Sequence, residues 1–216
     1  MKINIILFGY GRAGRVHYNY LKDNTKFNLT HIVEIIDISK EIDDKIKYVN
    51  FAEKSKINAL IHKTDAVIIT TPTSNHYELI MLGLKNNKHV FVEKPITHNL
   101  TEINECFDLA EKNNLILLVG YNRRFDPIIQ NIKSRIDAQE IGFVNYALSI
   151  SRDYPFPKQS FLKVSSGIFH DCATHDIDYF NWILKDKPIS VTVTCDDHND
   201  IEDYNYNHVS INFKYS

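Results

Sequence analysis

The sequence predicts an α/β protein, in which an N-terminal Rossmann-type, doubly wound parallel sheet is followed by an incomplete α+β domain with a mainly antiparallel sheet. Three observations lead to this fold class. Short apolar runs alternate with helical stretches over residues 1–120, a glycine-rich turn follows the first run, and alternating polar and apolar residues replace this pattern after Gly120. We therefore expect two domains, one over residues 1–120 and one over residues 121–216.

Five apolar runs in the first half are short enough to be strands that are buried on both faces. They cover residues 3–8, 29–37, 65–71, 89–94 and 115–120. The stretches between them predict helices at residues 12–23, 76–87 and 99–114. Asn99, with Glu102 three residues later, forms the cap pair expected at the start of the third helix. Strands and helices in this order form a parallel sheet that is covered by helices.

The second half has a different pattern, in which two helices are interspersed with three alternating stretches. The helices are expected at residues 126–139, beginning at Asp126-Pro127, and at residues 165–185. The alternating stretches, which predict strands of an antiparallel sheet, are residues 143–155, 189–196 and 206–215. No later strand follows the last of them in this sequence, so we expect an open sheet edge there and a homo-oligomer formed through the C-terminal sheet.

The composition excludes several classes of function. The chain has 216 residues with a net charge of −2 and no long basic run, so nucleic-acid or anionic-membrane binding has no electrostatic support. Three cysteines that lie far apart argue against a disulfide framework and indicate a reducing compartment. We find no signal peptide and no run long enough to span a membrane, so we expect a cytoplasmic protein.

The stretch GYGRAG directly follows the first strand and begins the first helix, which is the context that makes this motif informative. Gly9 allows the tight turn, Gly11 lets the backbone approach a pyrophosphate, and Gly14 permits close packing of helix and strand. Arg12 and Ala13 lie at the helix N-terminus, where free N–H groups face the phosphates. These residues predict a dinucleotide site.

An acidic residue is expected beside this site. Asp37 ends the second predicted strand, 23 residues after Gly14, where a carboxylate can bind both ribose hydroxyls. The same carboxylate would face the additional phosphate of NADP, so the sequence predicts NAD rather than NADP as the cofactor.

Two further motifs follow predicted strands at the edge where ligands of open α/β sheets bind. In TTPTSNH, Thr71, Pro72 and His76 are candidate cofactor contacts, although a turn proline and a histidine that merely begins a helix would give the same pattern. In EKP, Lys94 is a candidate for both the cofactor and the substrate pocket, with an ordinary surface lysine as the alternative. Glu93 is a candidate cofactor contact that could pair with Lys94.

The stretch SSGIFHDCATHDID, residues 165–178, concentrates titratable side chains. On a helix, Asp171, His175 and Asp178 lie on one face. Taken alone, the stretch is compatible with a polar helix face, with an acid–base pair, or with a metal site formed by histidine, cysteine and aspartate.

Together the motifs resemble the Gfo/Idh/MocA oxidoreductase family, and most closely its inositol 2-dehydrogenase-like members. The resemblance covers essentially the whole chain. The segments that carry it, in order, are GYGRAG…H, TTPTSNH, VEKP, GYNRRFDP, SRD and SGIFHDCATHDID.

The resemblance implies a Rossmann domain followed by an α/β domain with a large open sheet. It also implies an NAD(P)-dependent oxidoreductase that interconverts an alcohol and a ketone on a polyol or sugar. By motif position, Lys94 is similar to the family's active-site lysine, and Asp171 and His175 to its D-x-x-x-H pair. Arg124 and Asp153 occur in segments that line the substrate pocket in similar proteins.

With these roles, no metal is expected. His175 supplies a base with a pKa near working pH, Asp171 orients its ring, and Lys94 polarises the substrate oxygen. Family chains are longer than this sequence, so one alternative is a cofactor-binding regulatory or degenerate member without turnover. Within the enzyme class, the resemblance also leaves an NAD-dependent glycosidase, because the family contains members that cleave glycosides by transient hydride transfer.

Overall fold

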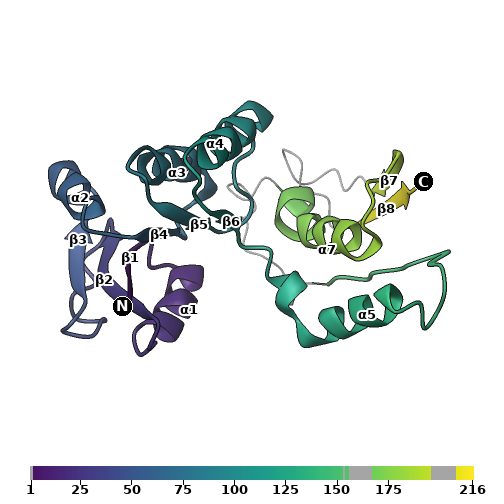
Figure 1. The fold of residues 1–216 in the computed structure, drawn as a ribbon, viewed down its shortest axis with the longest axis horizontal. Coiled ribbons are helices and arrows are strands. Elements are labelled where there is room, and N and C mark those ends of the chain that lie inside the picture. Colours follow the sequence, from purple (N-terminus) through teal and green to yellow (C-terminus); the bar gives the residue numbers. More distant parts are fainter. Residues whose placement is uncertain (1, 153, 156–166, 196–207) are drawn as a thin grey trace. The chain divides into compact units, whose positions relative to one another are not determined.

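A computed structural model describes residues 2–152, 154–155, 167–195 and 208–216. The chain folds into two compact units, Met1–Gly120 and Tyr121–Ser216 (Figure 1). Asp153, one of the predicted substrate residues, lies outside the described residues.

The N-terminal unit is built on a parallel sheet of six strands in the order β3-β2-β1-β4-β5-β6. The strands are β1 (Ile3–Phe8), β2 (Phe27–Glu34), β3 (Lys47–Asn50), β4 (Ala66–Ile69), β5 (His89–Val92) and β6 (Leu117–Val119). The α-helices are α1 (Arg12–Leu21), α2 (Lys54–Ile61), α3 (His76–Lys85) and α4 (Leu100–Lys112). At the start of α4 the Asn99 side chain accepts a hydrogen bond from the Thr101 amide, which confirms Asn99 as the cap residue. The predicted pairing with Glu102 was wrong, because the Asn99 amide donates its hydrogen bond to Oγ1 of Thr97.

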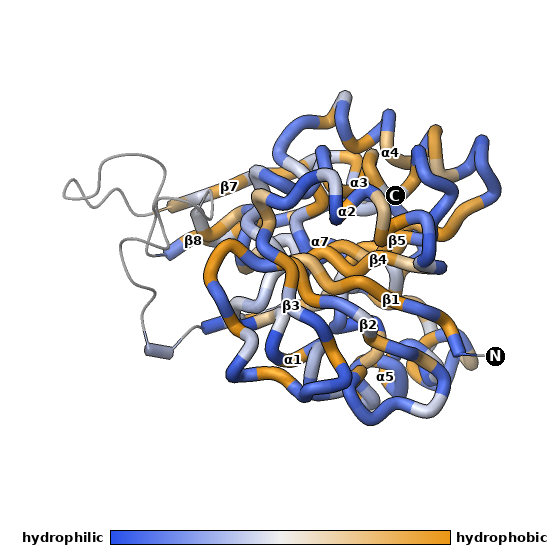
Figure 2. Tube along the Cα trace, turned by 90° about the vertical axis from the view of Figure 1, so that its left-hand side faces the viewer, coloured by the Kyte–Doolittle hydropathy of each residue, from blue (hydrophilic) through white to orange (hydrophobic). Residues whose placement is uncertain are grey.

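The sheet is covered on both faces, as the apolar runs predict. From β1, Ile6 and Phe8 belong to a core with α2, α3 and α4, whereas Ile5 and Leu7 belong to a second core with α1. Figure 1 shows α1 on one side of the sheet and the other three helices on the opposite side. The hydropathy colouring of Figure 2 marks β1, β4 and β5 as the apolar centre of this unit. Apolar side chains on both faces are typical of central strands in a parallel sheet.

The prediction for the N-terminal unit was wrong about the end of one strand and missed two elements. Strand β2 ends at Glu34 and not at Asp37, because the chain bends after Glu34 and leaves Ile35 and Ile36 exposed. The apolar character of those two residues had extended the predicted strand. In addition, β3 and α2 were not predicted, since a strand of four residues with one fully buried side chain, Val49, gives little periodic signal.

The C-terminal unit contains two longer α-helices and a two-stranded sheet among its described residues. These elements are α5 (Pro127–Asp137), α7 (Thr174–Leu184), β7 (Ser190–Cys195) and β8 (Val209–Lys214). Asp126 caps α5 by accepting hydrogen bonds from the amides of Ile128 and Ile129. Strands β7 and β8 pair in antiparallel fashion. The predicted α/β class, with a parallel first sheet and an antiparallel second one, is therefore confirmed.

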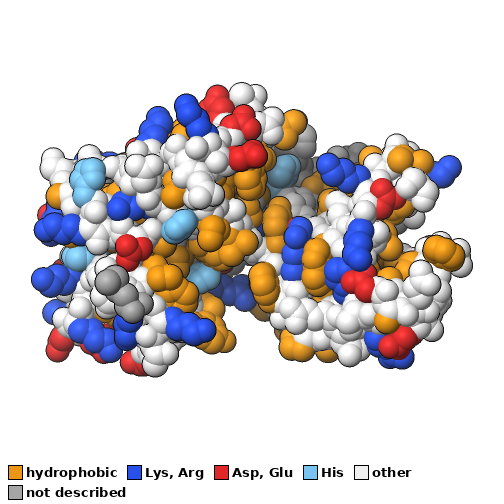
Figure 3. Space-filling model, viewed as in Figure 1, with side chains coloured by type: hydrophobic (Ala, Val, Ile, Leu, Met, Phe, Trp, Pro, Cys, Tyr) orange, Lys and Arg blue, Asp and Glu red, His pale blue; other side chains and the backbone are white. Residues whose placement is uncertain are grey.

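The strand predicted over residues 143–155 was wrong for the described part of that range, which forms neither strand nor helix. Polar and apolar residues do alternate in this segment, but no described strand pairs with it. A segment without a neighbouring strand cannot form the hydrogen bonds that define a β-sheet. Phe143, Tyr146 and Leu148 are consequently exposed. Figure 3 shows hydrophobic side chains on the surface of this unit.

No helix among the described residues is both long enough and apolar enough to cross a membrane.

Candidate active site

The glycine-rich turn between β1 and α1 has a different steric demand at each glycine. Gly9 has φ +91°, and a Cβ there would lie 2.8 Å from the carbonyl carbon of Thr70. A Cβ at Gly14 would lie 2.3 Å from the carbonyl oxygen of Gly9, so this position admits no side chain. A Cβ at Gly11 would meet nothing within 4 Å. The space in front of Gly11 is therefore open to a ligand, and the first amides of α1 border it.

Glu34, the last residue of β2, holds this turn in place. Its carboxylate accepts a 2.6 Å hydrogen bond from the amide of Tyr10 and another of 2.6 Å from the amide of Ile35. Sequence reasoning had missed Glu34 because the acceptor and the Tyr10 donor are 24 residues apart. Charge-assisted bonds of this kind are among the stronger ones in proteins, and here they join the glycine turn to the end of the neighbouring strand.

Asp37 lies in the loop that follows β2, three residues beyond the strand end. Its carboxylate accepts a 2.8 Å hydrogen bond from the amide of Ser39, and this bond lowers the pKa of Asp37. The side chain is exposed and negatively charged at neutral pH.

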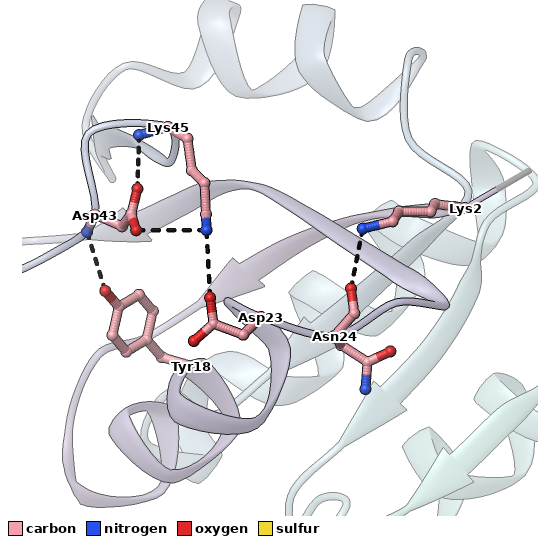
Figure 4. Close-up of polar contacts among 6 residues, drawn as sticks. All are labelled: Lys2, Tyr18, Asp23, Asn24, Asp43 and Lys45. Atoms are coloured by element: carbon pink, nitrogen blue, oxygen red, sulfur yellow. Dashed lines mark hydrogen bonds and ion pairs between the residues drawn. The ribbon is translucent and has the colours of Figure 1, made fainter.

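The loop that carries Asp37 is fastened to α1. The hydroxyl of Tyr18 accepts a 3.0 Å hydrogen bond from the amide of Asp43, and Lys45 lies 3.4 Å from both Asp23 and Asp43 (Figure 4). On the same helix, Arg15 forms a 2.6 Å ion pair with Glu41. Because several contacts connect loop and helix, the glycine turn and the Asp37 loop form one framework.

The carboxyl end of β4 contributes Thr71, whose hydroxyl oxygen is buried without a hydrogen-bond partner among the described residues. A buried hydroxyl in this state is costly unless a ligand satisfies it. Pro72 begins the short turn into α3 with φ −56°. His76 is buried at 1% exposure, and its ring nitrogens lie 2.8 Å from the carbonyl oxygen of Thr71 and 2.9 Å from that of Pro95. Both nitrogens of His76 are thus engaged within the protein.

Glu93 and Lys94 follow β5 at the same edge of the sheet. The carboxylate of Glu93 lies 2.8 Å from Nε2 of His17 on α1, and both side chains are 25% exposed. Gly120 has no room for a side chain because a Cβ would lie 2.9 Å from Oε2 of Glu93. Lys94 itself is half-buried. The pairing of Glu93 with His17 was not predicted.

In the C-terminal unit, the segment with Asp171 does not form the regular helix that was predicted. Phe169–Ala173 forms a π-helical turn that leads directly into α7. A π-turn carries an additional residue, and such turns occur frequently at functional sites. Asp171 and His175 are both half-buried, one before and one after the junction. The ring of Tyr121 stands at 89° to that of His175, with 6.4 Å between centroids.

Arg124 and Asp178 form a bidentate pair beside His175. The guanidinium donates bonds of 2.8 Å and 2.5 Å to the two carboxylate oxygens. Hydrogen bonding to Asp178 raises the pKa of Arg124, and burial followed by the charge of Asp178 raises the pKa of Tyr121. Arg124 was predicted as a substrate residue, and the structure places Asp178 as its partner.

Asp176 was given no role by the sequence, but it connects α7 to the segment before Asp153. It accepts hydrogen bonds from the hydroxyls of Ser149 at 2.6 Å, Ser151 at 3.0 Å and Tyr179 at 3.1 Å. The signal lay in the serines of SISRD, which cannot be matched to an acceptor without the fold. Over the described ranges, no group of three or more histidine, cysteine or acidic side chains has a geometry that would hold a metal ion.

Two family models match this chain. The first, an oxidoreductase family with an NAD-binding Rossmann fold, matches residues 3–121, and the GFO/IDH/MocA C-terminal domain matches residues 129–215. The chain belongs to the Gfo/Idh/MocA oxidoreductase family. The match to an NAD-binding fold confirms NAD as the predicted cofactor.

Relatives within the family have inositol dehydrogenase names. The chain is 33% identical over 197 residues to inositol 2-dehydrogenase of Rhizobium meliloti (strain 1021), which covers 90% of this chain and 59% of that protein. It is 43% identical over 128 residues to scyllo-inositol 2-dehydrogenase (NAD(+)) of Bacillus subtilis (strain 168), covering 59% of this chain and 37% of that protein. The chain thus spans less than two thirds of the length of these relatives.

One solved structure illustrates the similarity in fold. The myo-inositol dehydrogenase from Corynebacterium glutamicum ATCC 13032 superposes with a TM-score of 0.85 and 26% identity, covering 100% of this chain and 66% of that one.

Proposed function

We propose that the protein is an NAD-dependent oxidoreductase that transfers a hydride between the nicotinamide and a hydroxyl-bearing carbon of a polyol or sugar. The observation that carries this proposal is the arrangement at the π-turn. Asp171, His175 and Asp178 lie along one helical segment, and Arg124, from the turn Asn122–Phe125, pairs with Asp178. Relatives of the chain in its family are named as inositol dehydrogenases.

The N-terminal residues are suited to the cofactor. Gly11 leaves the approach to the amides of α1 open, and the buried hydroxyl of Thr71, at the end of β4, has no hydrogen-bond partner within the described part of the chain. When bound there, NAD supplies the carbon that accepts the hydride. The protein's own contribution is to bind this group, to orient the substrate and to move one proton.

The proton is assigned to His175. An alcohol loses its hydroxyl proton as the hydride leaves its carbon, and imidazole is suited to accept that proton because its ordinary pKa lies close to neutral pH. We assign Asp171 the orientation of the ring and Lys94 the stabilisation of the developing charge on the oxygen. Arg124, which keeps further N–H groups beyond those bound by Asp178, is assigned a hydrogen bond to a second hydroxyl of the substrate.

NADH formation with inositols and related polyols tests the proposal. In variants, His175→Ala should reduce turnover by about 10² to 10⁴, the usual range for loss of one general acid or base, and Asp171→Asn should also reduce it. NADH affinity, measured by fluorescence, should stay unchanged because the glycine turn belongs to the other unit. His170→Ala is the matched control, since His170 is an exposed neighbour in the same π-turn and should leave turnover unchanged.

The results separate the candidate functions. NADH binding without reduction of NAD by any polyol would replace the dehydrogenase with the non-catalytic, cofactor-binding alternative. A His175→Ala variant with full turnover would remove His175 from the chemistry.

A further inference from the structure

A histidine contacts the residue on each side of Lys94. Before Lys94, the carboxylate of Glu93 lies 2.8 Å from Nε2 of His17. After Lys94, the carbonyl oxygen of Pro95 lies 2.9 Å from Nδ1 of His76. The two histidines come from different helices, His17 from α1 and His76 from the first position of α3.

Each contact is itself held in place. The ring of His17 meets that of Phe91 edge to face, with 5.0 Å between centroids. On its other side, Glu93 lies against Gly120, where even a Cβ would come within 2.9 Å of Oε2. The Glu93 side chain, directly before Lys94, is therefore contacted by His17 on one side and by Gly120 on the other.

His76 is held more tightly. At 1% exposure it is among the largest fully buried side chains, and it is a polar residue in an apolar unit. Its other nitrogen faces the carbonyl oxygen of Thr71 at 2.8 Å, so one ring connects the ends of β4 and β5. A neutral imidazole donates one of these two bonds, whereas the protonated ring donates both.

We propose that His17 and His76 are positioning residues for Lys94, acting through Glu93 and Pro95 respectively. The observed contacts are those of His17 with the Glu93 side chain and of His76 with the Pro95 carbonyl. The catalytic value of positioning Lys94 rests on the proposed function, which gives Lys94 a role at the substrate oxygen. Neither histidine is a catalytic residue in this proposal.

Two substitutions at His76 separate its two bonds. In His76→Asn the amide nitrogen takes the place of Nδ1 and keeps the bond to Pro95, whereas in His76→Gln it takes the place of Nε2 and keeps the bond to Thr71. At His17, glutamine retains a donor for Glu93 and alanine removes it. His62→Gln, at an exposed histidine after α2, is the control.

The folded protein is acetylated with limiting reagent and then digested. Mass spectrometry of the peptides gives the acetylation rate of Lys94. Lys112, exposed on α4, is the internal reference. Loss of one net hydrogen bond corresponds to a roughly 3- to 10-fold change in a local equilibrium. We expect His76→Gln and His17→Ala to accelerate labelling of Lys94 by that factor. His76→Asn, His17→Gln and His62→Gln should label like the wild type.

Equal labelling rates in His76→Asn and His76→Gln would overturn the proposal for His76, since a ring that merely fills space does not distinguish them. Wild-type labelling in His17→Ala would overturn it for His17. If the His76 variants fail to fold, the two variants at the partly exposed His17 still test whether the contact with Glu93 positions Lys94.

Turnover provides the second, independent reading. If the wild type reduces NAD with a polyol, kcat should fall in His76→Gln and His17→Ala while the affinity for NADH stays unchanged. If the wild type shows no turnover, the proposed function fails, and the labelling rates still decide whether the two histidines position Lys94.

Discussion

Replacement of Gly14 and Gly11 by alanine separates packing from ligand binding within a single turn. At Gly14 a Cβ would lie 2.3 Å from the carbonyl oxygen of Gly9 and 2.9 Å from its carbonyl carbon, whereas real Cβ contacts essentially never fall under 3.0 Å. Helix α1 must therefore move away from the turn by about 0.7 Å, or the turn must open. The hydroxyl of Thr70, 3.0 Å from the same position, lies against the new methyl group as well.

The expected cost is that of overpacking, about 1–3 kcal/mol of unfolding free energy. For a chain of this size that corresponds to a fall in Tm of roughly 2 to 12 °C. NADH affinity should fall too, because the shift of α1 moves the amides that border the ligand space.

Gly11→Ala provides the contrast. Gly11 has φ −68°, which any residue adopts, and its Cβ would meet no atom within 4 Å. Stability should change by less than about 1 kcal/mol, the difference between glycine and alanine at a helix N-cap. The methyl group projects into the space that a pyrophosphate needs, so NADH affinity should fall without a loss of Tm.

The assays are calorimetric unfolding and NADH fluorescence titration of the three proteins. Wild-type Tm in Gly14→Ala, or wild-type NADH affinity in Gly11→Ala, would refute the steric argument. Loss of Tm in both variants would show that Gly11 serves packing rather than binding.

Three further outcomes are expected. NAD should bind more tightly than NADP in calorimetry, and the preference should narrow at high salt because Asp37 is exposed; equal affinities at low salt would contradict this. Burial raises the pKa of the Cys106 thiol to about 11, so Cys106 should resist a disulfide reagent at pH 8 in the folded protein and react only after denaturation. Hydrogen bonds from Lys133 and Lys185 lower the pKa of Asp137, so its contribution to stability is present above the carboxyl's ordinary pKa and is lost as pH falls through the lowered one. Asp137→Asn should therefore reduce Tm at pH 7, and the difference in Tm from the wild type should shrink as the pH is lowered through the acidic range.

Local patterns in the sequence were sufficient for much of the N-terminal unit. The GYGRAG turn was predictable because its requirements lie within six residues, and the apolar runs of β1, β4 and β5 reflect burial on both faces. The N-caps at Asn99 and Asp126 were predictable for the same reason, since a cap and the amides it binds are neighbours.

Contacts between distant residues were beyond such patterns. His17 and Glu93 are 76 positions apart in the sequence, and Arg124 and Asp178 are 54 apart. The residues around each of them in the sequence do not indicate which distant residue it contacts. The π-turn at Phe169–Ala173 escaped prediction because one inserted residue leaves the spacing of apolar side chains nearly helical.

The strand order of the large sheet has a consequence for synthesis of the chain. Strand β1 emerges first but lies at the centre of the sheet, with β2 on one side and β4 on the other. About 60 residues separate the end of β1 from the start of β4. At a synthesis rate of roughly 5–20 residues per second, about 3 to 12 s pass before β4 has been made and can pair with β1. Its four consecutive buried residues, Ile5 to Phe8, therefore make β1 a segment that needs shielding on the ribosome.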